Sequence, residues 1–158
     1  MTKLKDAAEE FLAQKRIAVV GVSRDEKQPA NLIYRRLRDT GHDVVAVNPN
    51  AEEVEGDPCY AALTAIPAPV PDGVVVVTTP EVAEQVVADA DAAGIPRVWL
   101  HRGMGPGSSS EPAVEFCTEH GIAVIPGGCP NMFGETSDAG HRCMRVMLQL
   151  SGKVPRTL

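Results

Sequence analysis

The chain has 158 residues, of which 44% are hydrophobic, enough to form the core of one domain of common size. Its formal net charge is −6, which argues against nucleic acid or an anionic membrane surface as a partner. No apolar run approaches the roughly 20 residues of a membrane-spanning helix. None of the four cysteines stands in Cys-x-x-Cys spacing. These features predict a cytoplasmic protein with a single domain over residues 1–158.

Short apolar runs alternate with segments of helical periodicity along the chain. The predicted strands cover residues 17–20, 43–47, 74–77, 97–100 and 122–125. The predicted helices cover residues 3–15, 29–40, 80–93, 111–120 and 137–150, with a short helical turn over 60–65. This alternation implies a parallel sheet with right-handed crossovers. The predicted fold class is α/β, a Rossmann-type doubly wound sheet of five mainly parallel strands in three α/β/α layers.

The first loop after a strand is a glycine turn. Gly21 follows the strand over 17–20 directly, and the next helix begins near Pro29. In an open α/β sheet, backbone N–H groups and a helix N-terminus hold a phosphate at this place. Ser23 and Glu26, however, stand where the G-x-G-x-x-G dinucleotide motif has its second and third glycines. The loop therefore predicts a nucleotide-type ligand and disfavours an ordinary NAD site.

The basic residues near this loop fall into two groups. Arg24 and Lys27 lie within the loop and are expected to pair with ligand phosphates, because charge-assisted hydrogen bonds to phosphate are strong. The helix that follows carries three arginines on the side away from the core, and we expect these to face solvent. They are Arg35, Arg36 and Arg38.

The second loop begins with Asn48-Pro49, where NAD-binding sheets have an acid for the ribose hydroxyls. Asn48 has the groups to bond a ribose or an adenine edge, whereas Pro49 offers no N–H. Glu52 and Glu53 follow, and they would repel the 2′-phosphate of NADP. The alternative interpretation is a plain turn that starts at Asn48.

Four segments at the strand ends form a recognisable combination. They are Ala18–Ser23, Val44–Pro49, Val77–Glu81 and Val98–Gly103. Together they resemble the stand-alone CoA-binding domain family, and they are similar to the N-terminal CoA-binding domain of the succinyl-CoA synthetase α-subunit. The resemblance extends over about residues 10–130. It implies a Rossmann-type fold that holds coenzyme A, or a short acyl-CoA, by its nucleotide end.

The resemblance also implies a set of binding residues. Those expected around the phosphates are Gly21, Val22, Ser23, Arg24 and Lys27. Asn48 and Pro49 would lie against the adenosine, and its other side would be lined by Thr78, Thr79, Pro80 and Val82. His101 and Gly103, after the fourth strand, complete the predicted site, although many relatives have glutamine in place of His101.

The resemblance implies binding without the chemistry of the synthetase. No G-x-x-x-x-G-K-[ST] loop for ATP is present, and one domain uses the whole chain. His101 is the one acid–base candidate, and the sequence indicates no serine, cysteine or carboxylate that would act together with it. We therefore expect a non-catalytic sensor, carrier or regulatory domain, with a protein partner or a homo-oligomer left open. An NAD(P)-binding oxidoreductase is the first alternative.

The second alternative is a thiol-redox protein that forms a disulfide between Cys129 and CoA. Cys129 lies in the glycine-rich loop over 126–133, where N–H dipoles would lower its pKa. A small residue packed beneath that loop is the competing interpretation. A metal site is not expected, because His141 and Cys143 are two residues apart on a predicted helix and point in different directions.

Overall fold

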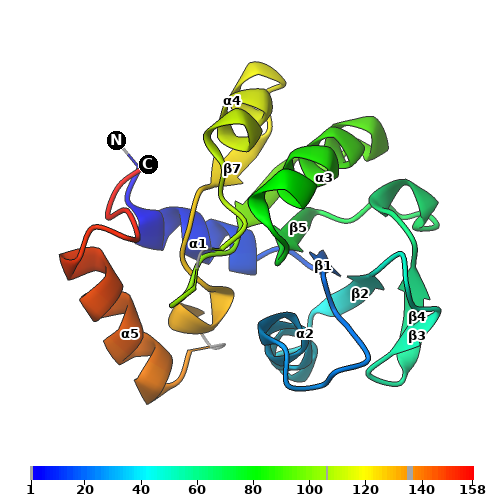
Figure 1. Cartoon of the computed structure of the whole chain (residues 1–158), viewed down its shortest axis with the longest axis horizontal. Helices are drawn as coiled ribbons and strands as arrows, with labels where there is room; N and C mark the ends of the chain where they lie inside the picture. Colours follow the sequence, from blue (N-terminus) through cyan, green and yellow to red (C-terminus); the bar gives the residue numbers. More distant parts are fainter. Residues whose placement is uncertain (1, 106, 135–136) are drawn as a thin grey trace.

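The computed structural model describes residues 2–105, 107–134 and 137–158, and the strands of these residues form one sheet (Figure 1). Its order is β3-β4-β2-β1-β5-β6-β7, and every neighbouring pair is parallel except β3 and β4. The strands are β1 (Arg16–Val20), β2 (Asp43–Val47), β3 (Glu53–Val54), β4 (Asp57–Tyr60), β5 (Gly73–Val76), β6 (Arg97–Leu100) and β7 (Ala123–Ile125). The doubly wound α/β sheet predicted from the sequence is confirmed.

The expectation of five strands is wrong, because a short hairpin extends the sheet beyond β2. β3 and β4 are joined by Glu55 and Gly56, whose φ angles are 54° and 79°. Two successive positive φ values are typical of the tight turn that joins antiparallel strands. The hairpin has only two and four residues in its strands and carries Pro58, so it lacks the apolar run that identifies a strand. Tyr60, expected to begin a helical turn, ends β4 instead.

The five α-helices found in the described residues follow the predicted segments. They are α1 (Leu4–Leu12), α2 (Pro29–Asp39), α3 (Pro80–Ala93), α4 (Glu111–Glu119) and α5 (Ala139–Leu150), with two short 3-10 turns, η1 (Leu63–Ala65) and η2 (Pro130–Met132). The Thr79 hydroxyl accepts a hydrogen bond from the N–H of Val82 at 3.4 Å and so caps α3. None of these helices is long and apolar enough to cross a membrane.

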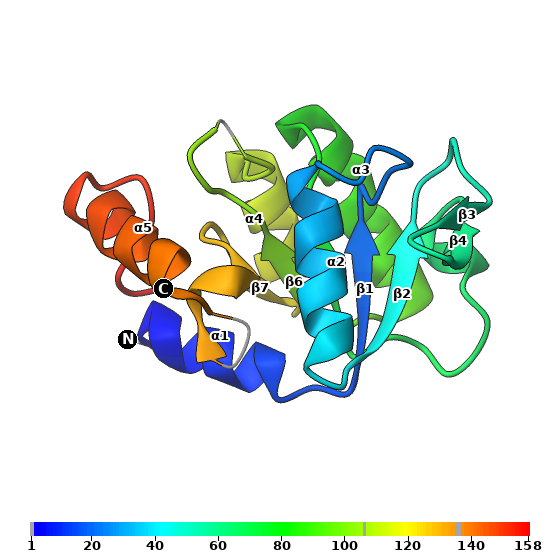
Figure 2. The ribbon, with the colours of Figure 1, turned by 90° about the horizontal axis from the view of Figure 1, so that it is seen from below.

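The helices cover both faces of the sheet. α1 and α2 pack on one face, with α5 beyond them, and α3 and α4 pack on the other (Figures 1 and 2). On the first face, the ring of Trp99 in β6 contacts Phe11 of α1 and Phe133, with ring centroids 5.4 and 5.7 Å apart. Its indole N–H donates to the carbonyl of Gly127 at 3.0 Å. The buried Trp99 therefore fixes the loop after β7 against the sheet.

Candidate functional site

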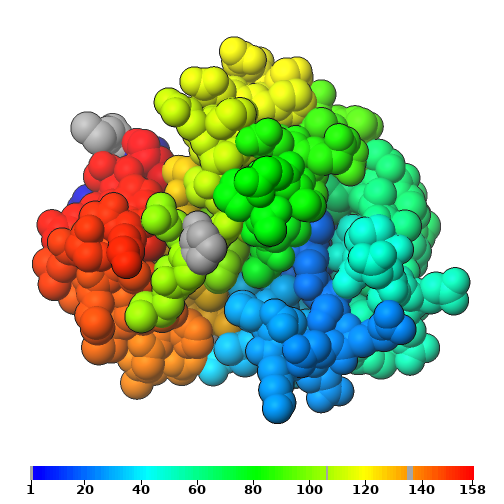
Figure 3. Space-filling model, viewed as in Figure 1, coloured from blue at the N-terminus to red at the C-terminus, as the bar shows by residue number. Residues whose placement is uncertain are grey.

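The loops at the carboxyl ends of β1, β5 and β6 surround a cavity of about 570 Å³. Ligands of open α/β sheets bind at this edge. Six of the predicted binding residues line the cavity, namely Lys27, Thr78, Thr79, Pro80, His101 and Gly103. In Figure 3, the yellow-green atoms of the loop after β6 lie between the green atoms of α3 and the orange atoms of α5. The structure thus brings nearly half of the predicted residues to one hollow.

The other predicted cation of the first loop lies elsewhere. Arg24 and Pro49 line a second, more open hollow of about 640 Å³, beside Asn50 and the acidic pair Glu52 and Glu53. The first loop therefore contributes Lys27 to the cavity and Arg24 to the open hollow. The side chains of Arg24 and Lys27 make no hydrogen bond or ion pair with the described part of the chain.

Gly21 allows the chain to turn directly after β1. Its φ is +108°, and a Cβ at this position would lie 2.2 Å from the carbonyl oxygen of Val77. Its N–H donates to the carbonyl of Val47 at 3.0 Å. Val22, the next residue, is fully buried. Gly21 and Val22 therefore shape the first loop. Neither has a side chain that a ligand could contact, so any contact would be with their backbone.

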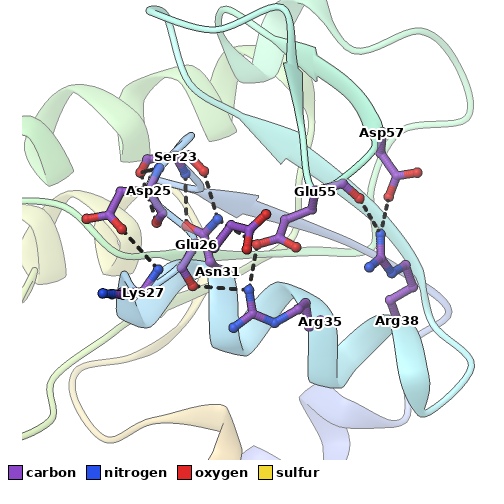
Figure 4. A network of polar contacts seen from close by, with 9 residues as sticks. All are labelled: Ser23, Asp25, Glu26, Lys27, Asn31, Arg35, Arg38, Glu55 and Asp57. Carbon is purple, nitrogen blue, oxygen red and sulfur yellow. Dashed lines mark hydrogen bonds and ion pairs between the residues drawn. The ribbon is translucent and has the colours of Figure 1, made fainter.

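A buried asparagine holds the first loop in place (Figure 4). Asn31, in the first turn of α2, accepts from the N–H of Ser23 at 3.0 Å and donates to its carbonyl at 2.7 Å. The Ser23 hydroxyl accepts from the N–H of Asp25 at 2.9 Å, so it is already bonded within the loop. Hydrogen bonds from Gln28 and Lys27 lower the pKa of Asp25. Sequence reasoning missed Asn31, although a polar residue among the apolar positions of a helix is a usable signal.

The arginines of α2 do not simply face solvent, as the sequence suggested. Arg35 donates to the Glu55 carboxylate at 2.6 Å, and Arg38 donates to the Asp57 carboxylate at 2.8 Å (Figure 4). Arg36 pairs with Asp138, just before α5. Two of these acids belong to the hairpin that the sequence analysis did not identify, so the partners of the arginines could not be anticipated either.

Asn48 connects the second loop to the first. Its amide donates to the carbonyl of Val22 at 2.9 Å and accepts from the N–H of Asn50 at 2.8 Å. Both polar ends of the Asn48 side chain are thus used within the protein. Val82 is half exposed on the first turn of α3 and lines neither of the two hollows.

The mouth and the inner end of the cavity differ in charge. α2 and α3 begin at the wall with Pro29 and Pro80, so two positive helix ends lie beside the exposed Lys27. The inner end, by contrast, consists of His101, Cys129 and Asn131. Burial lowers the pKa of His101 to about 4, with a further contribution from His141, so its imidazole is neutral at pH 7. The mouth favours an anion and the inner end an uncharged group.

Cys129 is not an activated thiol. Its side chain is buried, and burial raises its pKa to about 12, against the smaller lowering by the N–H of Asn131. The expectation that N–H dipoles lower this pKa is wrong, because desolvation of the thiolate outweighs them. A thiol protonated at neutral pH is a poor nucleophile, so the thiol-redox alternative is not favoured.

Two further residues of the cavity were missed at the level of sequence. Ser108 is buried, and its hydroxyl accepts from the N–H of Thr78 and donates to the Thr78 carbonyl, both at 2.7 Å. It thereby fixes the loop after β6 to the loop after β5. Asn131 is also fully buried, and neither end of its amide has a hydrogen-bond partner among the described residues. It lies within the 126–133 loop that the sequence indicated, but nothing distinguished it there.

Comparisons with known proteins agree with this architecture. The family model described as "CoA binding domain" matches residues 15–135. Acetate--CoA ligase [ADP-forming] I of Archaeoglobus fulgidus is 29% identical over 129 residues, 78% of this chain and 19% of the ligase, so the chain spans about a fifth of that relative. The uncharacterized protein YneT of Bacillus subtilis is 29% identical over 115 residues, 73% of this chain and 82% of YneT. A solved structure, a conserved hypothetical protein from Pyrococcus furiosus, has a TM-score of 0.62 at 34% identity and covers 70% of this chain and 90% of its own.

Proposed function

Since the chain belongs to the CoA-binding domain family, we propose that it binds coenzyme A or a short acyl-CoA as a sensor, carrier or regulatory domain without catalysis of its own. The observation that carries this proposal is the cavity at the strand ends, whose mouth favours an anion and whose inner end is uncharged. Coenzyme A has this polarity, because its phosphates lie at one end and its pantetheine arm is neutral.

We assign the predicted residues to the two parts of the ligand. The first loop, shaped by Gly21, Val22 and Ser23, is assigned to the phosphates, with Arg24 and Lys27 as the charged partners. Asn48 and Pro49 are assigned to the adenosine, beside the open hollow. The pantetheine arm then enters the cavity along Thr78, Thr79, Pro80, His101 and Gly103, so that the first three contact this arm in place of the adenosine that the resemblance implied. Val82 lines neither hollow and is left out of this assignment. The exposed position of Lys27 at the cavity mouth, without an acidic partner among the described residues, supports this direction.

Nothing in the site favours the oxidoreductase alternative. The first loop lacks the second and third glycines of the dinucleotide motif, and Asn48 stands where NAD-binding sheets have an acid for the ribose hydroxyls. His101 is the acid–base candidate of the sequence, and its lowered pKa keeps the ring neutral at pH 7, so it cannot act there as a general acid.

Replacement of Lys27 tests the proposed phosphate contact. A hydrogen bond to a charged group contributes about 1.5–3 kcal/mol, so Lys27→Gln is expected to weaken CoA binding roughly tenfold to a hundredfold in isothermal titration. Lys5→Gln is the matched control, because Lys5 is exposed on α1 and pairs only with Glu9 among the described residues. Equal affinities of the two variants for CoA would contradict the assignment of Lys27.

A further inference from the structure

The inner end of the cavity contains an amide that the protein itself does not use. Asn131 is fully buried, it lines the cavity, and both its nitrogen and its oxygen lack a hydrogen-bond partner among the described residues. Buried polar side chains in folded proteins are almost always hydrogen-bonded, so an exception calls for an explanation. The amide cannot turn outward to solvent, because the residue has no exposed surface.

The backbone of Asn131 is held firmly in place. It lies in η2, where the N–H of Met132 donates to the carbonyl of Cys129 at 2.9 Å. Phe133, the next residue after η2, packs against the buried ring of Trp99. Asn131 therefore belongs to a rigid part of the cavity wall, as is typical of residues that recognise a ligand.

The surroundings of this amide are uncharged. His101 is neutral at pH 7, Cys129 is a protonated thiol, and the adjoining wall includes Ile33 and Met144. His141 also reaches the wall, and its Nδ1 lies 2.7 Å from the Asp138 carboxylate, which in turn pairs with Arg36. Among the residues that line the cavity, Lys27 lies at the mouth, and the His141 ring at the inner end is engaged by Asp138. A ligand carboxylate placed there would lose its hydration and would meet no lysine or arginine among the described residues that line the inner end.

We infer that the inner end recognises the neutral arm of an acyl-CoA, with Asn131 paired to one of its amide or thioester carbonyl groups, and that it selects neutral acyl groups over acyl groups with a carboxylate. An asparagine side chain offers a donor and an acceptor together, which complements an amide of the pantetheine arm. This inference rests on the proposed function and adds to that function the class of acyl group that is bound.

Two acyl-CoAs of equal chain length test the selection. Butyryl-CoA and succinyl-CoA both carry four-carbon acyl groups, but only the second has a free carboxylate. In isothermal titration at pH 7.5, butyryl-CoA is expected to bind at least tenfold more tightly than succinyl-CoA. Equal affinities, or tighter binding of succinyl-CoA, would overturn the inference while leaving CoA binding intact. If CoA and both thioesters fail to bind, the proposed function itself is wrong.

Two variants of Asn131 separate recognition from packing. Asn131→Leu keeps the branching and the number of heavy atoms of the side chain and removes the unbonded amide, so it is expected to raise the Tm of the free protein and to weaken butyryl-CoA binding about tenfold. Asn131→Asp is expected to weaken binding further, because it places a negative charge there. Gln85→Glu, on the exposed side of α3, is the matched control for an amide-to-acid change and should leave affinity unaltered. A lower Tm for Asn131→Leu with unchanged affinity would assign Asn131 to packing and refute the inference.

Discussion

At the scale of single residues, Gly21, Asn31 and Asn131 show what sequence patterns reveal and what they omit. Gly21 was predictable, because a glycine directly after a buried strand marks a tight turn. Asn31 had a usable signal as a polar residue on the apolar side of a helix, but its partners Ser23 and Glu55 could not be predicted. Asn131 had no such signal, because its importance depends on the absence of partners among the described residues. Of the two interpretations of Cys129, the structure supports the small residue packed beneath the loop, since its burial raises the thiol pKa; this depth of burial cannot be derived from a glycine-rich sequence.

Gly21→Ala tests the close approach of the first loop to β5. An added Cβ would meet the carbonyl oxygen of Val77 at 2.2 Å, in addition to the strain of a positive φ. Gly41→Ala is the matched control, because Gly41 also has a positive φ but no atom within 4 Å of the Cβ position. In urea unfolding we expect a loss of about 1–2 kcal/mol for Gly41→Ala, from backbone strain alone, and a clearly larger loss for Gly21→Ala. Similar losses for both variants would show that the loop relaxes away from β5.

At the scale of elements, the central strands were predictable and the hairpin was not. Strands such as β1 and β5 are buried on both faces, so they appear as continuous apolar runs. The β3–β4 hairpin lies at the edge of the sheet and depends on contacts with α2. Glu55 accepts hydrogen bonds from Arg35 and Asn31, which joins the hairpin, α2 and the first loop into one network (Figure 4). Such long-range polar contacts leave no periodic signal in the sequence.

Removal of the Glu55 charge is therefore expected to loosen the hairpin selectively. Glu55→Gln keeps the size and the backbone conformation but weakens the bond to Arg35, because charge-assisted hydrogen bonds are roughly twice as strong as neutral ones. We expect a loss of about 1–2 kcal/mol in stability and faster hydrogen exchange in β3 and β4, with β1 unchanged. Glu53→Gln, at an exposed position of the same hairpin, should have almost no effect. Equal effects of the two changes would contradict the role of Glu55.

At the scale of the whole molecule, the sheet brings together loops that are far apart in the sequence. The alternation of strands and helices was enough to predict which loops share an edge, since parallel strands place their carboxyl ends on one side. The alternation could not predict that the two basic residues of the first loop line different hollows, Lys27 the cavity and Arg24 the open hollow. That division depends on the conformation of residues 21–28, which Asn31 fixes. We propose that the two hollows together accommodate one extended ligand.

The most direct test is thermal unfolding of the protein with CoA, acetyl-CoA, dephospho-CoA, NAD and NADP, each at the same concentration. A ligand at 100 times its Kd stabilises the folded state by about 2.7 kcal/mol, which a melting curve resolves. CoA and acetyl-CoA are expected to raise the Tm, dephospho-CoA to raise it less, and NAD and NADP to leave it unchanged. A rise in Tm with NAD or NADP and none with CoA would contradict CoA binding and point to the oxidoreductase alternative.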